Sequence, residues 1–267
     1  MMTVLAILNR TETARAVLRA VAELQTIYGG IPITLLRPRP DVEPGFMPTE
    51  EIMSPERRAH FEDREDKLTE TLRHAAKKVL PYEMMVERRG TVRTVVAAAA
   101  KEATVVVAGA AGHTGWSLAR DAIEAVLFDA AAPLLLLPNH VVSLHNRIVA
   151  VAWEGSTAVA EAVEAAMPML MSAEHVVVLE AEEGHAKVSR PESLMAALDG
   201  RAKQARVARF ALAGRDIGTA ILDEAAACGA GVLVMGAFTH MRLLERLFGG
   251  ATHEILEGAR IPLLLHH

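Results

Sequence analysis

The strongest constraint on this chain is that its second half repeats the pattern of its first. Residues 105–138 (VVVAGAAGHTGWSLARDAIEAVLFDAAAPLLLLP) and residues 232–267 (VLVMGAFTHMRLLERLFGGATHEILEGARIPLLLHH) share one order of features. Each has an apolar run, Gly-Ala, a short polar turn, a helical stretch and a last apolar run after proline. Apolar residues 3–8 and 148–152, which open the two halves, also correspond. A period near half the chain indicates two homologous domains, because solenoid units are far shorter.

Within each half, short apolar runs alternate with helical patterns. The predicted strands are residues 3–8, 33–36, 83–87, 104–108, 134–137, 148–152, 175–179, 206–211, 232–235 and 262–265. Near-continuous apolar runs, many of them rich in valine, are typical of parallel strands that are buried on both faces. The sequence therefore predicts an α/β fold of two tandem doubly wound domains, residues 1–141 and 145–267. Each domain is expected to hold a mostly parallel sheet of about five strands.

Local signals between the strands predict one long helix and one loop. Ser54-Pro55-Glu56 is a helix start, because serine caps, proline suits the first helical position and glutamate complements the helix dipole. Residues 37–48 contain four prolines and predict a loop or flap. Polar residues 139–147 predict the linker between the two domains.

Composition excludes several classes of protein. The 267 residues are 51% hydrophobic, which is incompatible with intrinsic disorder. The net charge of −5 and an aromatic content of 4% argue against nucleic-acid binding. The single cysteine, Cys228, excludes a disulfide scaffold and a multi-cysteine metal cluster. No apolar run approaches the roughly 20 residues of a membrane helix, and the N-terminus has no basic region or cleavage site of a secretory signal. We therefore expect a cytoplasmic protein.

The ends of two predicted strands in the second half form a candidate ligand site. In open α/β sheets, ligands bind beyond the carboxyl ends of the strands, near the switch point of strand order. Residues 148–152 are followed by Trp153-Glu154-Gly155-Ser156, and residues 232–235 by a turn that starts at Gly236. Farther on, Gly249-Gly250-Ala251-Thr252 opens an expected helix, and such a turn can cradle a phosphate. The alternative is that these glycines only form tight turns.

Two common nucleotide motifs are absent from the sequence. No GxxxxGK[ST] occurs, which argues against a P-loop NTPase, and no GxGxxG follows a predicted strand. Both halves instead resemble universal stress protein domains, which have an adenine nucleotide alpha hydrolase-like fold. The resemblance spans nearly the full length. Nucleotide-binding members of that family carry the ATP motif G-2x-G-9x-G-[S/T] after the fourth strand.

The second half keeps the spacing of this motif but departs from it at two positions. Gly236 and Gly249 match the first and third glycines, whereas Thr239 replaces the second glycine and Gly250 replaces the Ser or Thr. The family's acidic residue after strand one, which contacts the adenosine moiety, corresponds to Glu154. The resemblance thus implies one set of ATP-binding residues, with Ala181 as the apolar residue that ends strand two: Glu154, Ala181, Gly236, Thr239, His240, Gly249, Gly250 and Thr252.

The first half matches the motif less well. Gly109 and Gly112 fit its first two positions, but residues 120–123 stand where the phosphate turn belongs, and Asn9 replaces the acidic residue. Asp121 at that turn would repel phosphate. We therefore expect a degenerate, empty site in the first half.

Other polar residues are better explained by structure than by chemistry. Glu56, His60 and Asp63 share one helix face, yet the surrounding basic residues favour a solvated helix with salt bridges over a metal site. Cys228 is expected to be a structural cysteine on a helix, and Ser156 a helix N-cap. The sequence predicts no catalytic residue and no metal ligand.

Together these features predict a cytoplasmic universal stress protein that binds or senses ATP through its second domain and acts as a non-catalytic regulator. Whether Mg²⁺ accompanies the nucleotide and whether a slow ATPase activity exists stay open. The alternative is a nucleotide-free scaffold of the same fold, and an enzyme that acts on phosphate esters ranks last. The resemblance also implies edge-to-edge pairing of residues 134–137 with 262–265. A homodimer and protein partners remain open.

Overall fold

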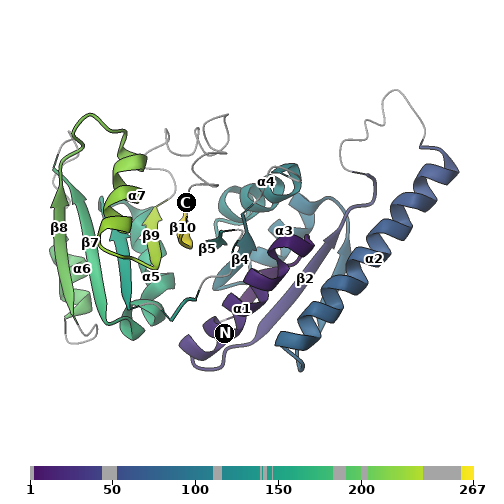
Figure 1. The fold of residues 1–267 in the computed structure, drawn as a ribbon, viewed down its shortest axis with the longest axis horizontal. Helices are drawn as coiled ribbons and strands as arrows, with labels where there is room; N and C mark the ends of the chain where they lie inside the picture. The colour runs from purple at the N-terminus through teal and green to yellow at the C-terminus, as the bar shows by residue number, and fades with distance from the viewer. Residues whose placement is uncertain are drawn as a thin grey trace.

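One continuous sheet organises the whole molecule (Figure 1). The computed structural model describes residues 3–43, 53–110, 116–138, 140, 143–145, 147–182, 191–199, 204–236 and 260–267. Over these residues the sheet has ten strands, in the order β3-β2-β1-β4-β5-β10-β9-β6-β7-β8. β5 and β10 meet in the middle and pair antiparallel, and the other neighbouring strands pair parallel. Each half therefore contributes the same strand order, third, second, first, fourth, fifth, counted from its outer edge.

The ten predicted strands are all present, and most bounds move by only a few residues. They are β1 (Val4–Ile7), β2 (Ile33–Arg39), β3 (Met85–Arg89), β4 (Val105–Gly109), β5 (Leu134–Leu137), β6 (Ile148–Ala152), β7 (His175–Ala181), β8 (Ala205–Phe210), β9 (Val232–Gly236) and β10 (Leu263–His266). The predicted α/β class with a mostly parallel sheet is confirmed.

Helices cover both faces of this sheet. They are α1 (Thr11–Ile27), α2 (Pro55–Val79), α3 (Val92–Ala100), α4 (Trp116–Glu124), α5 (Thr157–Ser172), α6 (Glu192–Leu198) and α7 (Ile217–Ala227), with a π-helical turn, Ala125–Asp129, after α4. α1, α2, α5 and α6 pack on one face, which we call the first face. α3, α4, the π-helical turn and α7 pack on the opposite, second face.

Strand side chains alternate between these two cores. Val4 and Ala6 of β1 belong to the first-face core, whereas Leu5 and Ile7 belong to the second-face core, and all four are at most 3% exposed. Successive side chains of a strand point to opposite faces, so a strand covered on both sides needs apolar residues throughout. This explains why inner strands such as β1, β4 and β9 are continuous apolar runs, whereas the edge strands β3 and β8 are not.

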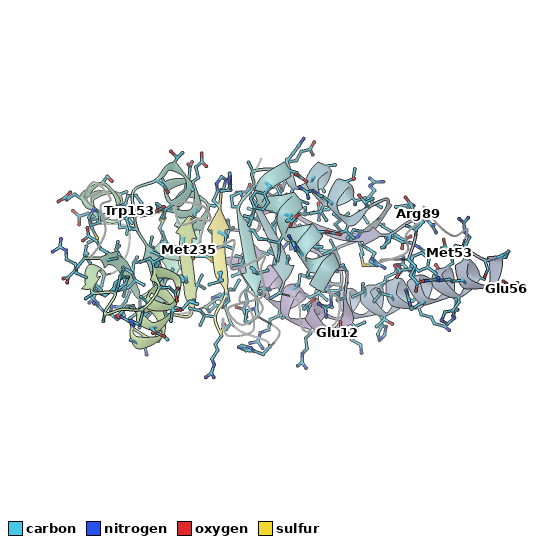
Figure 2. All side chains as sticks on the ribbon, turned by 90° about the horizontal axis from the view of Figure 1, so that it is seen from above. Glu12, Met53, Glu56, Arg89, Trp153 and Met235 are labelled. Atoms are coloured by element: carbon cyan, nitrogen blue, oxygen red, sulfur yellow. The ribbon has the colours of Figure 1, made fainter. Side chains whose placement is uncertain are left out.

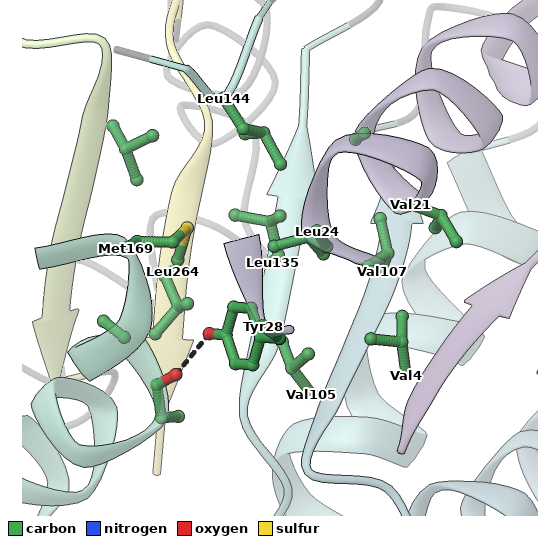
Figure 3. Close-up of a cluster of buried hydrophobic side chains, with 14 of the residues drawn as sticks. Val4, Val21, Leu24, Tyr28, Val105, Val107, Leu135, Leu144, Met169 and Leu264 are labelled. Carbon is green, nitrogen blue, oxygen red and sulfur yellow. Dashed lines mark hydrogen bonds between the residues drawn. The ribbon is translucent and has the colours of Figure 1, made fainter. Parts of the chain in front are cut away.

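The two halves meet at a buried seam around β5 and β10 (Figure 3). Leu264 lies opposite Leu135 in the antiparallel pair, and both are fully buried. Beside them the Tyr28 hydroxyl, from the C-cap of α1, donates a hydrogen bond to the Ala165 carbonyl oxygen of α5. Burial raises the pKa of Tyr28. The seam is therefore an apolar contact with one specific hydrogen bond between the first-face helices of the two halves.

The N-terminus of α2 is built as the sequence predicts. The Ser54 hydroxyl oxygen accepts a hydrogen bond from the Arg57 backbone N–H at 3.2 Å, and Pro55 occupies the first helical turn. The missing N–H of proline costs nothing there, because the first N–H groups of a helix have no partner within it.

The prediction of a loop over residues 37–48 is wrong at its start. β2 continues through Arg37, Pro38 and Arg39, each paired with a residue of β3. Ion pairs of two buried arginines hold this segment extended: Arg37 with the buried Glu65, and Arg39 Nη1 with Oδ1 of the exposed Asp66 at 2.6 Å, both partners on α2. Prolines favour a loop by local rules, but carboxylates distant in sequence stabilise the strand here. Residues 44–48 lie outside the described part of the chain.

A second polar contact ties α1 to the segment that joins the halves. The Glu23 carboxylate accepts hydrogen bonds from the Leu144 backbone N–H, from the Ser143 hydroxyl at 3.1 Å and from Arg19 Nε at 3.2 Å. Burial alone would raise the pKa of Glu23, but these hydrogen bonds outweigh it and hold the pKa below its usual value.

This contact predicts a specific acid sensitivity. Because the folded state lowers the pKa of Glu23, the ionised carboxylate stabilises the fold above its unfolded pKa of about 4.3. That stabilisation is lost as the pH falls through the lower, folded-state pKa. Urea unfolding should therefore show Glu23→Gln less stable than the natural chain at pH 7, with a difference that shrinks towards pH 3. Exposed Glu164→Gln is the control, and a pH-independent difference would contradict the prediction.

Candidate functional site

The candidate site lies where β6 is flanked by β9 on one side and β7 on the other. Ala152, the last residue of β6, pairs with Met235 of β9 and with Leu179 of β7. The chain after β6 crosses over as α5 on the first face, and β6 and β9 form the switch point of strand order in this half. Figure 2 labels Trp153 and Met235, which neighbour Glu154 and Gly236 in sequence, in the same half of the molecule. The expected juxtaposition of these strand ends is therefore present.

Gly236 is required by a close approach at this point. A Cβ atom placed on it would lie 3.0 Å from the Val159 backbone nitrogen, 3.1 Å from Glu154 Oε1 and 3.3 Å from Ala158 Cβ. The first turn of α5 and the Glu154 carboxylate thus lie directly against the end of β9. Two predicted site residues, Glu154 and Gly236, are in contact.

The turn that carries Glu154 has a fixed geometry. Gly155 adopts a φ of +75°, in the left-handed region that favours glycine, and so reverses the chain between β6 and α5. Ser156 is the N-cap of α5, as predicted, and its oxygen accepts a hydrogen bond from the Val159 N–H at 3.2 Å. The same hydroxyl donates to Glu154 Oε1. The half-buried carboxylate is therefore held beside the helix N-terminus, where the dipole favours negative charge.

Ala181 lies on the neighbouring strand. It is the last residue of β7 and stands two residues beyond Leu179, just as Glu154 stands two beyond Ala152. It is half-buried and packs against the second-face core. The parallel register therefore places Ala181 at the same edge of the sheet as Glu154. The other candidate residues, Thr239, His240, Gly249, Gly250 and Thr252, lie outside the described residues.

Trp153 is a polar group at this edge that the sequence prediction did not assign to the site. Its ring packs against the first-face core, while its buried Nε1–H has no hydrogen-bond partner among the residues that the structure describes. An aromatic residue directly after a buried strand, in a chain with only 4% aromatic residues, was the available signal. The indole therefore adds a hydrogen-bond donor on the residue that directly precedes Glu154 in the sequence.

The corresponding glycine of the first half, Gly109, also lies against the helix that follows the first strand. A Cβ on Gly109, at the end of β4, would lie 2.3 Å from Thr13 Cβ. Thr13, in the first turn of α1, is only 2% exposed. Arg120 and Asp121, at the expected phosphate turn, lie within helix α4, and burial raises the pKa of Asp121. A helix thus replaces the glycine turn that a phosphate would need. Gly112 lies outside the described residues.

The other polar residues considered from the sequence, those on α2 and Cys228, form contacts that stabilise the fold. On α2, the exposed Asp63 forms an ion pair with Lys67 at 2.7 Å, as expected of a solvated helix. Cys228 is the C-cap of α7, packs against the second-face core and donates from Sγ to the Ala225 carbonyl oxygen at 3.2 Å. Within the described ranges, no group of three or more His, Cys, Asp or Glu side chains is arranged to hold a metal ion.

Comparison with known proteins agrees with this geometry. Residues 146–267 match the profile of the universal stress protein family. A universal stress protein from Archaeoglobus fulgidus DSM 4304 superposes with a TM-score of 0.71 at 16% identity, covering 99% of this chain and 95% of its own. A putative universal stress protein from Pseudomonas aeruginosa UCBPP-PA14 gives a TM-score of 0.54 at 14% identity, covering 100% and 93%. A protein of unknown function from P. aeruginosa PAO1 gives 0.54 at 13%, covering 100% and 92%. No curated protein matches the chain.

The fold and the strand-end site define a doubly wound α/β protein with its candidate ligand edge in the second half. The similarity to solved structures extends this fold over nearly the whole chain. Residues 146–267 are a universal stress protein domain. Within the part of the chain that the structure describes, no helix combines the length and apolarity needed to cross a bilayer.

Proposed function

We propose that this chain is a cytoplasmic regulator that binds an adenine nucleotide, ATP, through its second half. The observation that carries the proposal is the contact between Glu154 and Gly236 at the switch point of a universal stress protein domain. The two halves act as a tandem pair of homologous domains, of which only the second has an acidic residue, Glu154, where the first has Asn9. The chain itself does no chemistry on the nucleotide, and its output passes to a protein partner or to a second copy.

The residues present suit a nucleoside better than a bare phosphate at this point. A carboxylate accepts hydrogen bonds from ribose hydroxyls, as in other α/β nucleotide folds. The Glu154 charge would repel phosphate groups, so the phosphates belong farther along the chain, at the glycine turn with Gly249, Gly250 and Thr252. Backbone N–H groups of such a turn hold phosphates without a lysine. Thr239 and His240, after β9, supply further polar groups.

The test is isothermal titration of the full chain with ATP and Mg²⁺. We expect one equivalent to bind, with a dissociation constant raised about tenfold or more in Glu154→Gln, because a hydrogen bond to a charged group contributes about 1.5–3 kcal/mol. Gly249→Asp should abolish binding by placing a negative charge at the phosphate turn. Exposed Glu164→Gln on α5 is the matched control and should bind like the natural chain.

A nucleotide-free scaffold is the second candidate. It is favoured by the two departures from the family motif, Thr239 and Gly250. If millimolar ATP produces neither heat nor a rise in the unfolding midpoint, the nucleotide proposal is wrong and the scaffold becomes the leading function. Release of phosphate by the natural chain, lost in Gly249→Asp, would instead establish an ATPase.

A further inference from the structure

A groove on the first half has the features of a second ligand site, far in the fold from the switch point of the second half. It lies on the second face, between α3 and strands β1, β2 and β3, and its volume is about 610 Å³. Small-molecule sites usually measure about 300–1,000 Å³ and are mostly apolar with a few polar groups. Half-buried Val86 and Val95, with the buried Leu5 and Leu36, give it an apolar surface that Thr34 and Thr94 interrupt.

The groove exists because the wall of α3 is built from small side chains. Residues 97–100 of this helix are four alanines, and Ala98 and Ala99 line the groove. Val96 and Ala100 are fully buried against the sheet, whereas Ala98 is exposed. A larger residue at position 98 or 99 would fill the space.

The charges at the two ends of the groove differ in sign. Arg88 and Arg89 line it at the carboxyl end of β3, and Glu102 lines it at the opposite end, beyond α3. Arg89 forms an ion pair with Glu62 at 3.2 Å. Arg88 is exposed, and within the described part of the chain it forms no ion pair with a carboxylate. A guanidinium is suited to two parallel hydrogen bonds with a carboxylate.

The length of the groove limits the apolar part of a ligand. Strand register places Arg88 beside Pro38, four residues beyond Thr34 on β2, and Thr34 pairs with Leu5. At about 3.3 Å per residue this stretch of the groove is roughly 13 Å long. An extended hydrocarbon chain of about ten carbons, with C–C bonds of about 1.5 Å, has a similar length.

We propose that this groove binds an amphipathic anion: an unbranched acyl chain with a carboxylate head. The carboxylate pairs with Arg88, and the chain lies along Leu36, Val86 and the alanines of α3 towards Glu102. The acidic end fixes the orientation, because a carboxylate placed beside Glu102 would be repelled. This site is separate from the proposed nucleotide site, so either can fail without the other.

The test is titration of the full chain with sodium decanoate below its micelle concentration. We expect one saturable equivalent, with a dissociation constant raised about tenfold by Ala98→Phe, which fills the groove, and about fivefold by Arg88→Gln, which removes the head contact. The matched controls are Ala59→Phe and Arg58→Gln. Both change exposed residues of α2, which packs on the opposite face of the sheet. Both controls should bind like the natural chain.

Three results would overturn the proposal. They are the absence of saturable binding, equal affinity for neutral decanol, and equal weakening by the α2 control variants. Because Phe at an exposed helix position is not expected to unfold the chain, an unchanged unfolding midpoint is required of Ala98→Phe. If that variant fails to fold, Arg88→Gln, which alters an exposed side chain, decides the outcome together with the salt dependence of decanoate binding.

Discussion

Replacing Arg37 with methionine, with Glu65 left in place, is expected to lower the free energy of unfolding by about 3–5 kcal/mol. Arg37 is 1% exposed and Glu65 is 7% exposed, and they form an ion pair between β2 and α2. The cost arises because the variant leaves an uncompensated carboxyl inside the protein. Urea unfolding followed by circular dichroism measures this difference directly.

The double variant Arg37→Met/Glu65→Leu makes the prediction specific. Apolar residues of similar size often replace a buried ion pair at little cost, so we expect the double variant to regain most of the lost stability. As a control, Arg73→Met removes the partner of Glu70 on the exposed side of α2 and should cost below about 1 kcal/mol. A double variant as unstable as Arg37→Met would contradict the prediction and mean that the guanidinium itself, through its contact with Pro38, holds β2.

The fold was predictable because its signals are local and repeated. Each strand buried on both faces is a continuous apolar run, and Ser54 and Ser156 mark helix starts by chemistry that acts within one turn. The error at residues 37–39 has the opposite cause. Nothing near Arg37-Pro38-Arg39 in the sequence indicates a strand, since the carboxylates that hold it come from α2, 28 and 27 residues further along the chain. Local rules favour a loop there, and tertiary ion pairs override them.

In the candidate site, too, some features could be predicted from the sequence and others could not. The proximity of Glu154 and Gly236 followed from the topology of parallel sheets, because the carboxyl ends of adjacent strands must meet at one edge. The packing of Thr13 against Gly109 in the first half could not be predicted, since it depends on how closely α1 approaches the end of β4. The groove beside α3 could not be predicted either: the sequence shows four alanines at residues 97–100, but not that Ala98 and Ala99 face a groove beside β2 and β3.

Leu264→Ala is expected to destabilise the whole molecule by about 2–5 kcal/mol, although the residue lies only three positions from the C-terminal residue in this sequence. Its side chain is fully buried between β5 and β9 in the middle of the sheet, next to Leu135 and the first-face core. Figure 3 shows it near Tyr28 and Met169, which come from the helices of the two halves. Truncation therefore leaves a cavity at the seam, where little can collapse to fill it.

This result would separate a shared core from two halves that merely touch. If β10 frayed independently, as chain ends often do, Leu264→Ala would cost below about 1 kcal/mol. Leu222→Ala, at a half-buried position of α7, supplies the matched control and should cost less than the seam variant. Hydrogen exchange adds a second measurement. In the natural chain the β5 and β10 amides should exchange only through global unfolding, because each strand is hydrogen-bonded on both sides. In Leu264→Ala the amides of both halves should lose protection together, since one sheet and one first-face core run through the seam.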